Sequence, residues 1–268
     1  MHGVVYHPLD PANPFDLPFM LKDGRAKIGL RLADDAEWLH RDDDHDAQLR
    51  LKAQLLVVHD DSVACLDDGV APSEELLAAV EQRTGQTGDR GLRPIDAAGR
   101  LVQEDLCILD GESLVLVAGS VCFPQGWLLS SKIGLSMRDV HAPVPYYESI
   151  ADPADRVVHG LESELRWRMN WFVVGSDRLR SEPGHPLEGP IRLHLRFERQ
   201  TLRRLPETGG VVFTIRSYIS PIEAIDDRPR LQRGLLRALE TMSDLERSYH
   251  GNLAPAELAK DYLRSKLT

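Results

Sequence analysis

Apolar residues recur every three or four positions in several stretches of the chain, a spacing that places them on one side of a helix. The first stretch covers residues 36–58, and the acidic run 42–46 in its middle predicts a solvated break. A second helix is expected to begin at Pro72 and end at Gly85. Further helices are expected from Asp152, which we assign as an N-cap, over 231–251, and from Pro255 to Tyr262.

Runs rich in β-branched and aromatic residues alternate with these helices and predict strands. Segments 105–110 and 113–121 flank Asp110-Gly111-Glu112, a turn signal that predicts a hairpin. Further strands are expected over 167–174, 191–199 and 211–218. Strands in the centre with helices before, within and after them indicate an α+β fold with an antiparallel sheet. We expect a single domain over residues 1–268, whose proline-rich first thirty residues form an extended arm.

Composition narrows the classes of function. The net charge of −10 argues against a nucleic-acid-binding protein, because binding to phosphates needs a basic surface. The chain shows neither a signal-peptide pattern at its start nor an apolar run long enough to span a membrane. We therefore expect a cytoplasmic protein that binds neither nucleic acid nor membrane.

The three cysteines, Cys65, Cys107 and Cys122, have spacings that match no zinc, iron–sulfur or disulfide framework. The sequence also has no glycine-rich dinucleotide loop and no P-loop. If the protein takes part in electron transfer, the flavin or iron–sulfur centre is expected on another chain.

The segment from Cys122 to Pro145 is the densest in unusual residues. Pro143 disfavours helix at Ala142, so a short helix ending near Val140 would present His141 at a rigid turn. A histidine that ligates iron needs such a fixed backbone and a partner for its second ring nitrogen. From spacing alone, a capping or core histidine is the competing interpretation.

Alternation along the expected strand 191–199 places Glu198 on one face with Arg192, His194 and Arg196. A carboxylate in such a position can hold a protonated amine in a dry pocket. The alternative is a surface glutamate paired with neighbouring arginines. The acidic run with His40 and His45 suggests a metal cluster only weakly, because such runs are usually solvated loops.

Five strings resemble the DUF3445 family in order and spacing, and the resemblance covers most of the chain. They are Cys122-Phe123-Pro124-Gln125-Gly126-Trp127, Val140-His141-Ala142-Pro143-Val144-Pro145, Trp167-Arg168-Met169-Asn170-Trp171, Phe197-Glu198-Arg199-Gln200-Thr201-Leu202-Arg203-Arg204-Leu205-Pro206 and Phe213-Thr214-Ile215-Arg216-Ser217-Tyr218. The resemblance implies a PAS-like haem-binding domain with flanking N- and C-terminal helices. It also implies oxidative N-demethylation of a small secondary amine with O2, using haem b and electrons from a separate NADPH-dependent flavin and [2Fe–2S] reductase.

Carried over to this sequence, the resemblance favours His141 as the axial iron ligand, with His194 and His159 as alternatives. Glu198 is the candidate catalytic residue that positions the amine. The candidates for contact with the haem are Arg199, Arg203, Arg204 and Arg216, whose guanidinium groups suit propionates, and the aromatic Trp171. Two further hypotheses remain: a haem-binding sensor or carrier without turnover, and a family member that has lost haem and serves as an interaction module.

Overall fold

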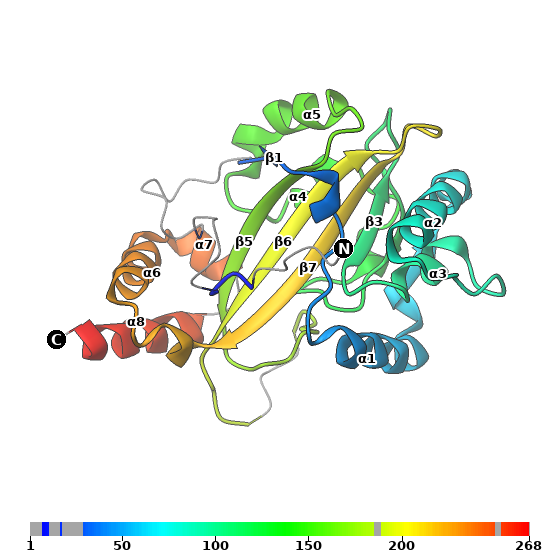
Figure 1. Cartoon of the computed structure of the whole chain (residues 1–268). Coiled ribbons are helices and arrows are strands. Elements are labelled where there is room, and N and C mark those ends of the chain that lie inside the picture. Colours follow the sequence, from blue (N-terminus) through cyan, green and yellow to red (C-terminus); the bar gives the residue numbers. More distant parts are fainter. Residues whose placement is uncertain (1–6, 11–16, 18–28, 185–188, 250–252, 268) are drawn as a thin grey trace.

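One antiparallel sheet of seven strands forms the centre of the protein, which is described here from a computed structural model (Figure 1). The structure describes residues 7–10, 17, 29–184, 189–249 and 253–267. The strand order is β1-β5-β6-β7-β3-β4-β2, which confirms the expected α+β class with an antiparallel sheet. The strands are β1 (Arg31–Leu32), β2 (Val63–Cys65), β3 (Asp105–Leu109), β4 (Leu116–Ser120), β5 (Arg166–Val174), β6 (His194–Arg204) and β7 (Val211–Pro221).

The long strands β5, β6 and β7 define two faces of the sheet. Asn170, Glu198 and Ser217 are paired in register and share one face, whereas their chain neighbours Met169, Arg199 and Arg216 share the other. We name these the α5 face and the α2 face after a helix that packs on each. Residues adjacent in the sequence of β6 therefore belong to different environments.

Two groups of helices cover the α2 face, and Figure 1 shows them on opposite sides of the three long strands. The first group is α2 (Val70–Thr84) and α3 (Pro94–Gly99), and the second is α6 (Pro229–Thr241) and α8 (Leu253–Leu267). The predicted apolar stripe of α2, formed by Leu76, Leu77 and Val80, is buried against the sheet. Gly85 ends this helix with φ 71°, a left-handed conformation that glycine adopts without strain.

The α5 face is covered by the segment between β4 and β5, which contains α4 (Met137–His141) and α5 (Ala151–His159). Met137, Ala154 and Val158 from these helices pack against strand residues such as Cys107 and Leu202. Short 3-10 helices complete the chain: η2 (Asp35–Glu37), η3 (Asp60–Ser62), η4 (Asp67–Gly69), η5 (Leu129–Ser131), η6 (Tyr147–Ile150) and η7 (Ile222–Ile225).

Several expected boundaries differ from the structure. The first long helix, α1, covers His45–Val58 only, and His45 is buried rather than part of a solvated break. Ile150, not Asp152, is the N-cap of α5, because the helix begins one residue before the Asp-Pro pair. The expected C-terminal helix is split into α6 and α7 (Asp244–Tyr249).

Most of the expected N-terminal arm lies outside the described residues. Leu9 and Leu17 are described, and both are buried with α6 and α8. Within the part of the chain that the structure covers, no helix is long and apolar enough to cross a membrane.

Candidate functional site

The helix α4 positions His141 at its last residue, as the sequence predicted. Ser136 caps the helix, because its hydroxyl accepts a hydrogen bond from the backbone N–H of Asp139 at 3.1 Å and donates one to the Asp139 carboxylate at 2.7 Å. At the other end, the Lys132 ammonium donates to the carbonyl of Val140 at 2.6 Å. These contacts fix the short helix at both ends and so fix the backbone that carries His141.

The imidazole of His141 is held by two contacts. Its Nδ1 lies 2.8 Å from the carbonyl oxygen of Met137, and its ring stacks on Tyr147 with centroids 4.7 Å apart. Burial lowers the pKa of His141, which favours the neutral ring. A neutral ring that donates from Nδ1 to a carbonyl leaves the lone pair of Nε2 for a metal, the arrangement common in metal-binding histidines.

A hollow of about 410 Å³ adjoins this histidine and is lined by residues 142–148 and Leu245. Tyr146 in its wall has φ 61°, which is uncommon for a residue with a side chain. The buried hydroxyl of Tyr147 has no hydrogen-bond partner among the described residues, and burial raises the pKa of Tyr147 to about 12. A buried hydroxyl of this kind is a donor that a ligand can satisfy.

Glu198 lies on the α5 face, with Arg196 on the same face as predicted. Its side chain is 8% exposed, and its two oxygens accept hydrogen bonds from Arg196 Nε at 3.0 Å and Gln200 Nε2 at 3.3 Å. Arg196 also donates to the carbonyls of Leu179 and Phe123, both at 2.6 Å. The surface ion pair considered from the sequence is therefore a buried one, anchored to two loops.

Arg168 is a residue of this face that the sequence reasoning missed. It lies on β5 diagonally across from Glu198, since Asn170 is the direct partner of Glu198 and Arg168 that of Gln200. Burial lowers the pKa of Arg168, the charge of Glu198 raises it, and the positive charge of Arg168 in turn lowers the pKa of His141. Within the described residues, Arg168 forms no hydrogen bond or ion pair. It belongs to the string Trp167-Arg168-Met169-Asn170-Trp171, which resembles the DUF3445 family.

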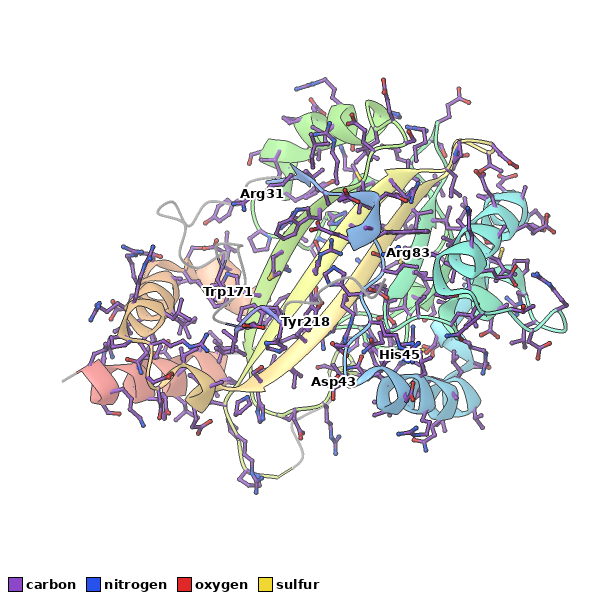
Figure 2. The ribbon with its side chains drawn as sticks, viewed as in Figure 1. Arg31, Asp43, His45, Arg83, Trp171 and Tyr218 are labelled. Carbon is purple, nitrogen blue, oxygen red and sulfur yellow. The ribbon has the colours of Figure 1, made fainter. Side chains whose placement is uncertain are left out.

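The structure divides the other candidates between the two faces. Arg199, Arg216 and Trp171 lie on the α2 face, and Figure 2 shows Trp171 and Tyr218 on the side of the sheet turned toward the viewer. Arg203 is on the same face, where it pairs with Asp35 at 2.7 Å. The sheet lies between this group and the residues His141 and Glu198.

Arg204 has a different environment. Its guanidinium donates to the carbonyls of five residues, namely Leu161, Gly209, Gly111, Val158 and His159. Two of these carbonyls belong to the last turn of α5, where a cation is favourable. The side chain thus joins α5 to two turns.

The alternative histidines are less constrained than His141. His159 is exposed at the end of α5, as predicted, and His194 begins β6 with its Nδ1 2.9 Å from the carbonyl of Arg192. In the described part of the chain, no three His, Cys, Asp or Glu side chains gather as a metal-ion site.

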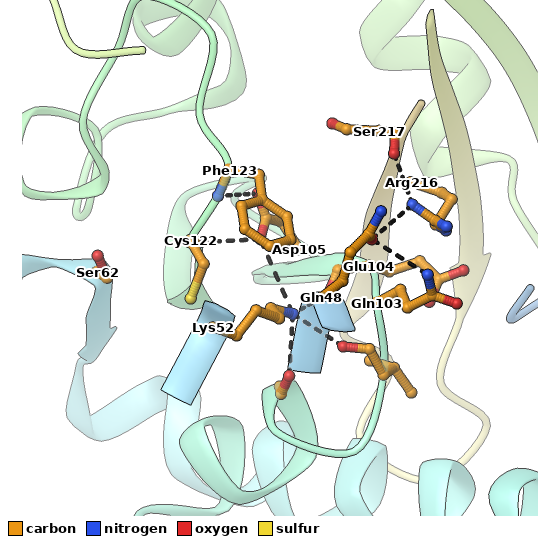
Figure 3. Close-up of polar contacts among 12 residues, drawn as sticks. Gln48, Lys52, Ser62, Gln103, Glu104, Asp105, Cys122, Phe123, Arg216 and Ser217 are labelled. Carbon is orange, nitrogen blue, oxygen red and sulfur yellow. Dashed lines mark hydrogen bonds and ion pairs between the residues drawn. The ribbon is translucent and has the colours of Figure 1, made fainter. Parts of the chain in front are cut away.

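A buried network around Lys52 and Asp105 was also missed (Figure 3). The ammonium of Lys52, which is 0% exposed, donates to the carbonyls of Gly99, Val102 and Glu104 at 2.6–3.0 Å and lies 3.9 Å from Asp105. Asp105 in turn accepts from the backbone N–H groups of Cys122 and Phe123 at 2.8 and 2.9 Å. The signal for it was present, since Lys52 interrupts the apolar positions of a predicted helix.

One protein-family model covers the region that carries these residues. Residues 79–257, more than half of the chain, match the model of the family described as haem-dependent oxidative N-demethylase, alpha subunit-like. The matched region includes α4, β5, β6 and β7, and therefore His141, Arg168 and Glu198. The chain belongs to the haem-dependent oxidative N-demethylase, alpha subunit-like family.

Proposed function

We propose that this protein is the haem-binding component of an oxidative N-demethylase that removes a methyl group from a small secondary amine. In this proposal haem b would be held on the α5 face by Nε2 of His141, and Glu198 would position the amine. A separate NADPH-dependent flavin and [2Fe–2S] reductase supplies electrons, and O2 is the oxidant. The sheet with α4 and α5 is then the PAS-like haem-binding domain of the DUF3445 family.

The observation that carries the proposal is the hydrogen bond between His141 Nδ1 and the carbonyl of Met137, in a family described as haem-dependent. This bond selects the tautomer whose Nε2 can bind iron, and the capped α4 fixes the direction of the ring. The lowered pKa of His141 keeps the ring unprotonated at neutral pH, so no proton competes with the metal.

The same face offers a partner for the carboxylates of haem. The guanidinium of Arg168 is partly buried and forms no hydrogen bond to another described residue, which is costly for a cation unless a ligand compensates it. Guanidinium groups bind carboxylates in a bidentate manner, so we assign Arg168 to a haem propionate. The buried hydroxyl of Tyr147 is a further donor beside the ligand histidine.

Glu198 has the capacity to hold an ammonium group. A carboxylate offers about four acceptor positions, and here Arg196 and Gln200 use two of them. An ammonium N–H that occupies a third position would be held at a fixed place on the α5 face. Bound haem supplies the activation of oxygen, and the contribution of Glu198 is to orient the methyl group toward it.

The proposed contacts of Arg199, Arg203, Arg216 and Trp171 with haem do not belong to this arrangement, because these residues lie on the α2 face. Arg204 is on the α5 face, but its guanidinium is occupied by backbone carbonyls. For these five residues, contact with haem stays a prediction, and the experiments below test it for Arg199.

The first test is titration of the purified protein with haemin, followed in the Soret region before and after reduction and addition of carbon monoxide. His141→Ala is expected to lose the sharp, saturable Soret band while its far-UV circular dichroism stays unchanged. The matched control is His159→Ala, which removes an exposed histidine and should bind haem as the wild type does. Wild-type spectra from His141→Ala would overturn the assignment, and loss of the band in His194→Ala would move it to that residue.

A second test separates an enzyme from a haem-binding sensor or carrier. With dimethylamine, O2 and a chemical or enzymatic reductant, the wild type should release formaldehyde, and Glu198→Gln should lose most of this activity while retaining the haem spectrum. Saturable haem binding without formaldehyde from this or other small secondary amines would favour the sensor or carrier. No saturable haem binding would favour an interaction module.

A further inference from the structure

Two buried arginines face each other on the α2 face. Arg199 on β6 and Arg216 on β7 are direct partners in the register, and their side chains are 3% and 1% exposed. Like charges directly opposite one another destabilise a sheet unless other groups compensate them. The contacts of each arginine therefore show which of the two positive charges has a partner that balances it.

Arg216 is well compensated. Its guanidinium is ion-paired with the carboxylate of Asp42 and donates to the side-chain oxygen of Gln48 at 2.9 Å. It also stacks on the ring of Tyr218, 4.6 Å from the ring centroid. Its Nε has no partner among the residues that the structure describes.

Arg199 has weaker contacts than Arg216. Its one hydrogen bond to a described residue is a long contact of 3.4 Å to the carbonyl of Trp38, and its Nε has no partner. The guanidinium stacks on Trp167 at 5.7 Å from the ring centroid. No carboxylate of the described residues forms an ion pair with it, although a buried cation without an anion is strongly unfavourable.

Burial lowers the pKa of Arg199, whereas the charges of Tyr218, Glu104 and Glu37 raise it. Glu104 is the buried carboxyl group among these three, yet it does not form an ion pair with Arg199. Glu104 is 1% exposed, and one of its oxygens accepts the backbone N–H of His40 at 2.8 Å. Its other oxygen is buried without a partner in the described part of the chain. Burial raises the pKa of Glu104, which favours the protonated carboxyl group. An unpartnered guanidinium N–H and an unpartnered carboxyl oxygen thus lie on the same side of the sheet.

We propose that Arg199, assisted by Glu104, binds a carboxylate group on the α2 face, at a site distinct from that of His141. The guanidinium provides the charge and the donors that a carboxylate requires, and the free oxygen of a protonated Glu104 can donate one more hydrogen bond. The same chemistry has two sources, namely a small carboxylic acid and a propionate of haem. The site depends only on groups of the α2 face and does not rest on the function proposed above.

The test is a titration with sodium acetate against sodium chloride at equal ionic strength, on protein free of haem. Tryptophan fluorescence reports on Trp38 and Trp167, which contact Arg199, and thermal unfolding provides a second readout. We expect a saturable acetate response in the wild type that is at least tenfold weaker in Arg199→Gln. Glu104→Gln, which keeps a hydrogen-bond donor without a charge, should bind acetate at least as tightly as the wild type.

The matched control is Arg166→Gln, which removes an arginine of the neighbouring strand β5 that pairs with Glu164 and should leave the acetate response unchanged. If Arg199→Gln does not fold, Arg199→Lys keeps the charge and loses the planar fork, and should still weaken acetate binding. An equal response to chloride and acetate would overturn the proposal, as would an Arg199 variant that folds and binds acetate like the wild type. Ordered water would then be the expected partner of Arg199 Nε and of the free oxygen of Glu104.

Haemin distinguishes the two sources. Unchanged haem affinity in Arg199→Gln, together with lost acetate binding, identifies a small carboxylic acid as the occupant. Weaker haem affinity in this variant, with acetate competing against haemin in the wild type, identifies a propionate. Failure of the His141 assignment would leave the acetate results unaffected, so the two proposals can fail separately.

Discussion

Replacement of Lys52 by methionine tests how the buried network supports the candidate site. The change keeps the length of the side chain but removes the ammonium that binds three carbonyls and faces Asp105. The carboxylate of Asp105 then remains buried with only the N–H groups of Cys122 and Phe123 as partners. The carbonyl of Phe123 accepts a hydrogen bond from Arg196, and Arg196 donates another to Glu198. The substitution should therefore also affect the position of Glu198.

The expected loss follows from these contacts. Removing one partner of a buried ion pair typically costs about 3–5 kcal/mol, because the remaining charge is left uncompensated. The three carbonyls also lose a charged donor, which lowers the free energy of unfolding further, although backbone relaxation and water recover part of this loss. We therefore expect Lys52→Met to lower the free energy of unfolding by about 3–5 kcal/mol.

The loss should depend on pH. Burial raises the pKa of Asp105 and the charge of Lys52 lowers it, so removing Lys52 raises the pKa of this carboxyl further. A raised pKa in the folded state means that stability is retained at low pH and lost as the pH rises through that pKa. The difference between Lys52→Met and wild type should therefore be larger at pH 8 than at pH 5.

Urea unfolding followed by circular dichroism measures both effects. The double variant Lys52→Met/Asp105→Asn should be more stable than the sum of the single changes predicts, by about 0.5–3 kcal/mol, because it leaves no buried charge. A loss below about 1 kcal/mol for Lys52→Met, or strict additivity in the cycle, would refute the view that this pair is buried and coupled.

Three further predictions concern single residues. Arg204→Met should lower the free energy of unfolding by about 2–4 kcal/mol, because it leaves the carbonyls between α5 and the turns unpaired, and urea unfolding would measure it. Tyr146→Asn should raise the unfolding free energy by about 0.5–1 kcal/mol, since asparagine tolerates φ 61° better; an unchanged value in the same assay would contradict this. Iodoacetamide at pH 8 should label the partly exposed Cys65 first, because burial raises the pKa of Cys107 to about 12 and that of Cys122 to about 11, and peptide mass spectrometry would detect early labelling of either.

Periodicity predicted the regular elements well, because local spacing determines which side of a helix or strand is buried. The hairpin formed by β3 and β4, the stripe of α2 and the end of α4 at His141 follow from residues close in the sequence. The small helix α3 (Pro94–Gly99) was missed because six residues are too few for a periodic pattern. Burial of His45 was missed because its acidic neighbours dominate the local composition.

The candidate site was harder to predict, since it depends on contacts between distant strands. Alternation placed Glu198 with Arg196 on one face correctly, but no local pattern shows that Arg199 and His141 lie on opposite sides of the sheet. Arg168 was missed because its relation to Glu198 depends on the register between β5 and β6. A lysine within an apolar stripe was the one visible sign of the Lys52–Asp105 pair.

The alternation along β6 also limits how the gene for this protein can change in length. A deletion of one codon within β6 would move every later side chain of the strand to the opposite face. A deletion before Glu198 would therefore turn Glu198 toward α2 and Arg199 toward α5. Codons added within residues 205–210, the turn between β6 and β7, would leave both strands in place. Natural variation in length is therefore expected at that turn, while the interior of β6 should keep its residue count even where its side chains differ.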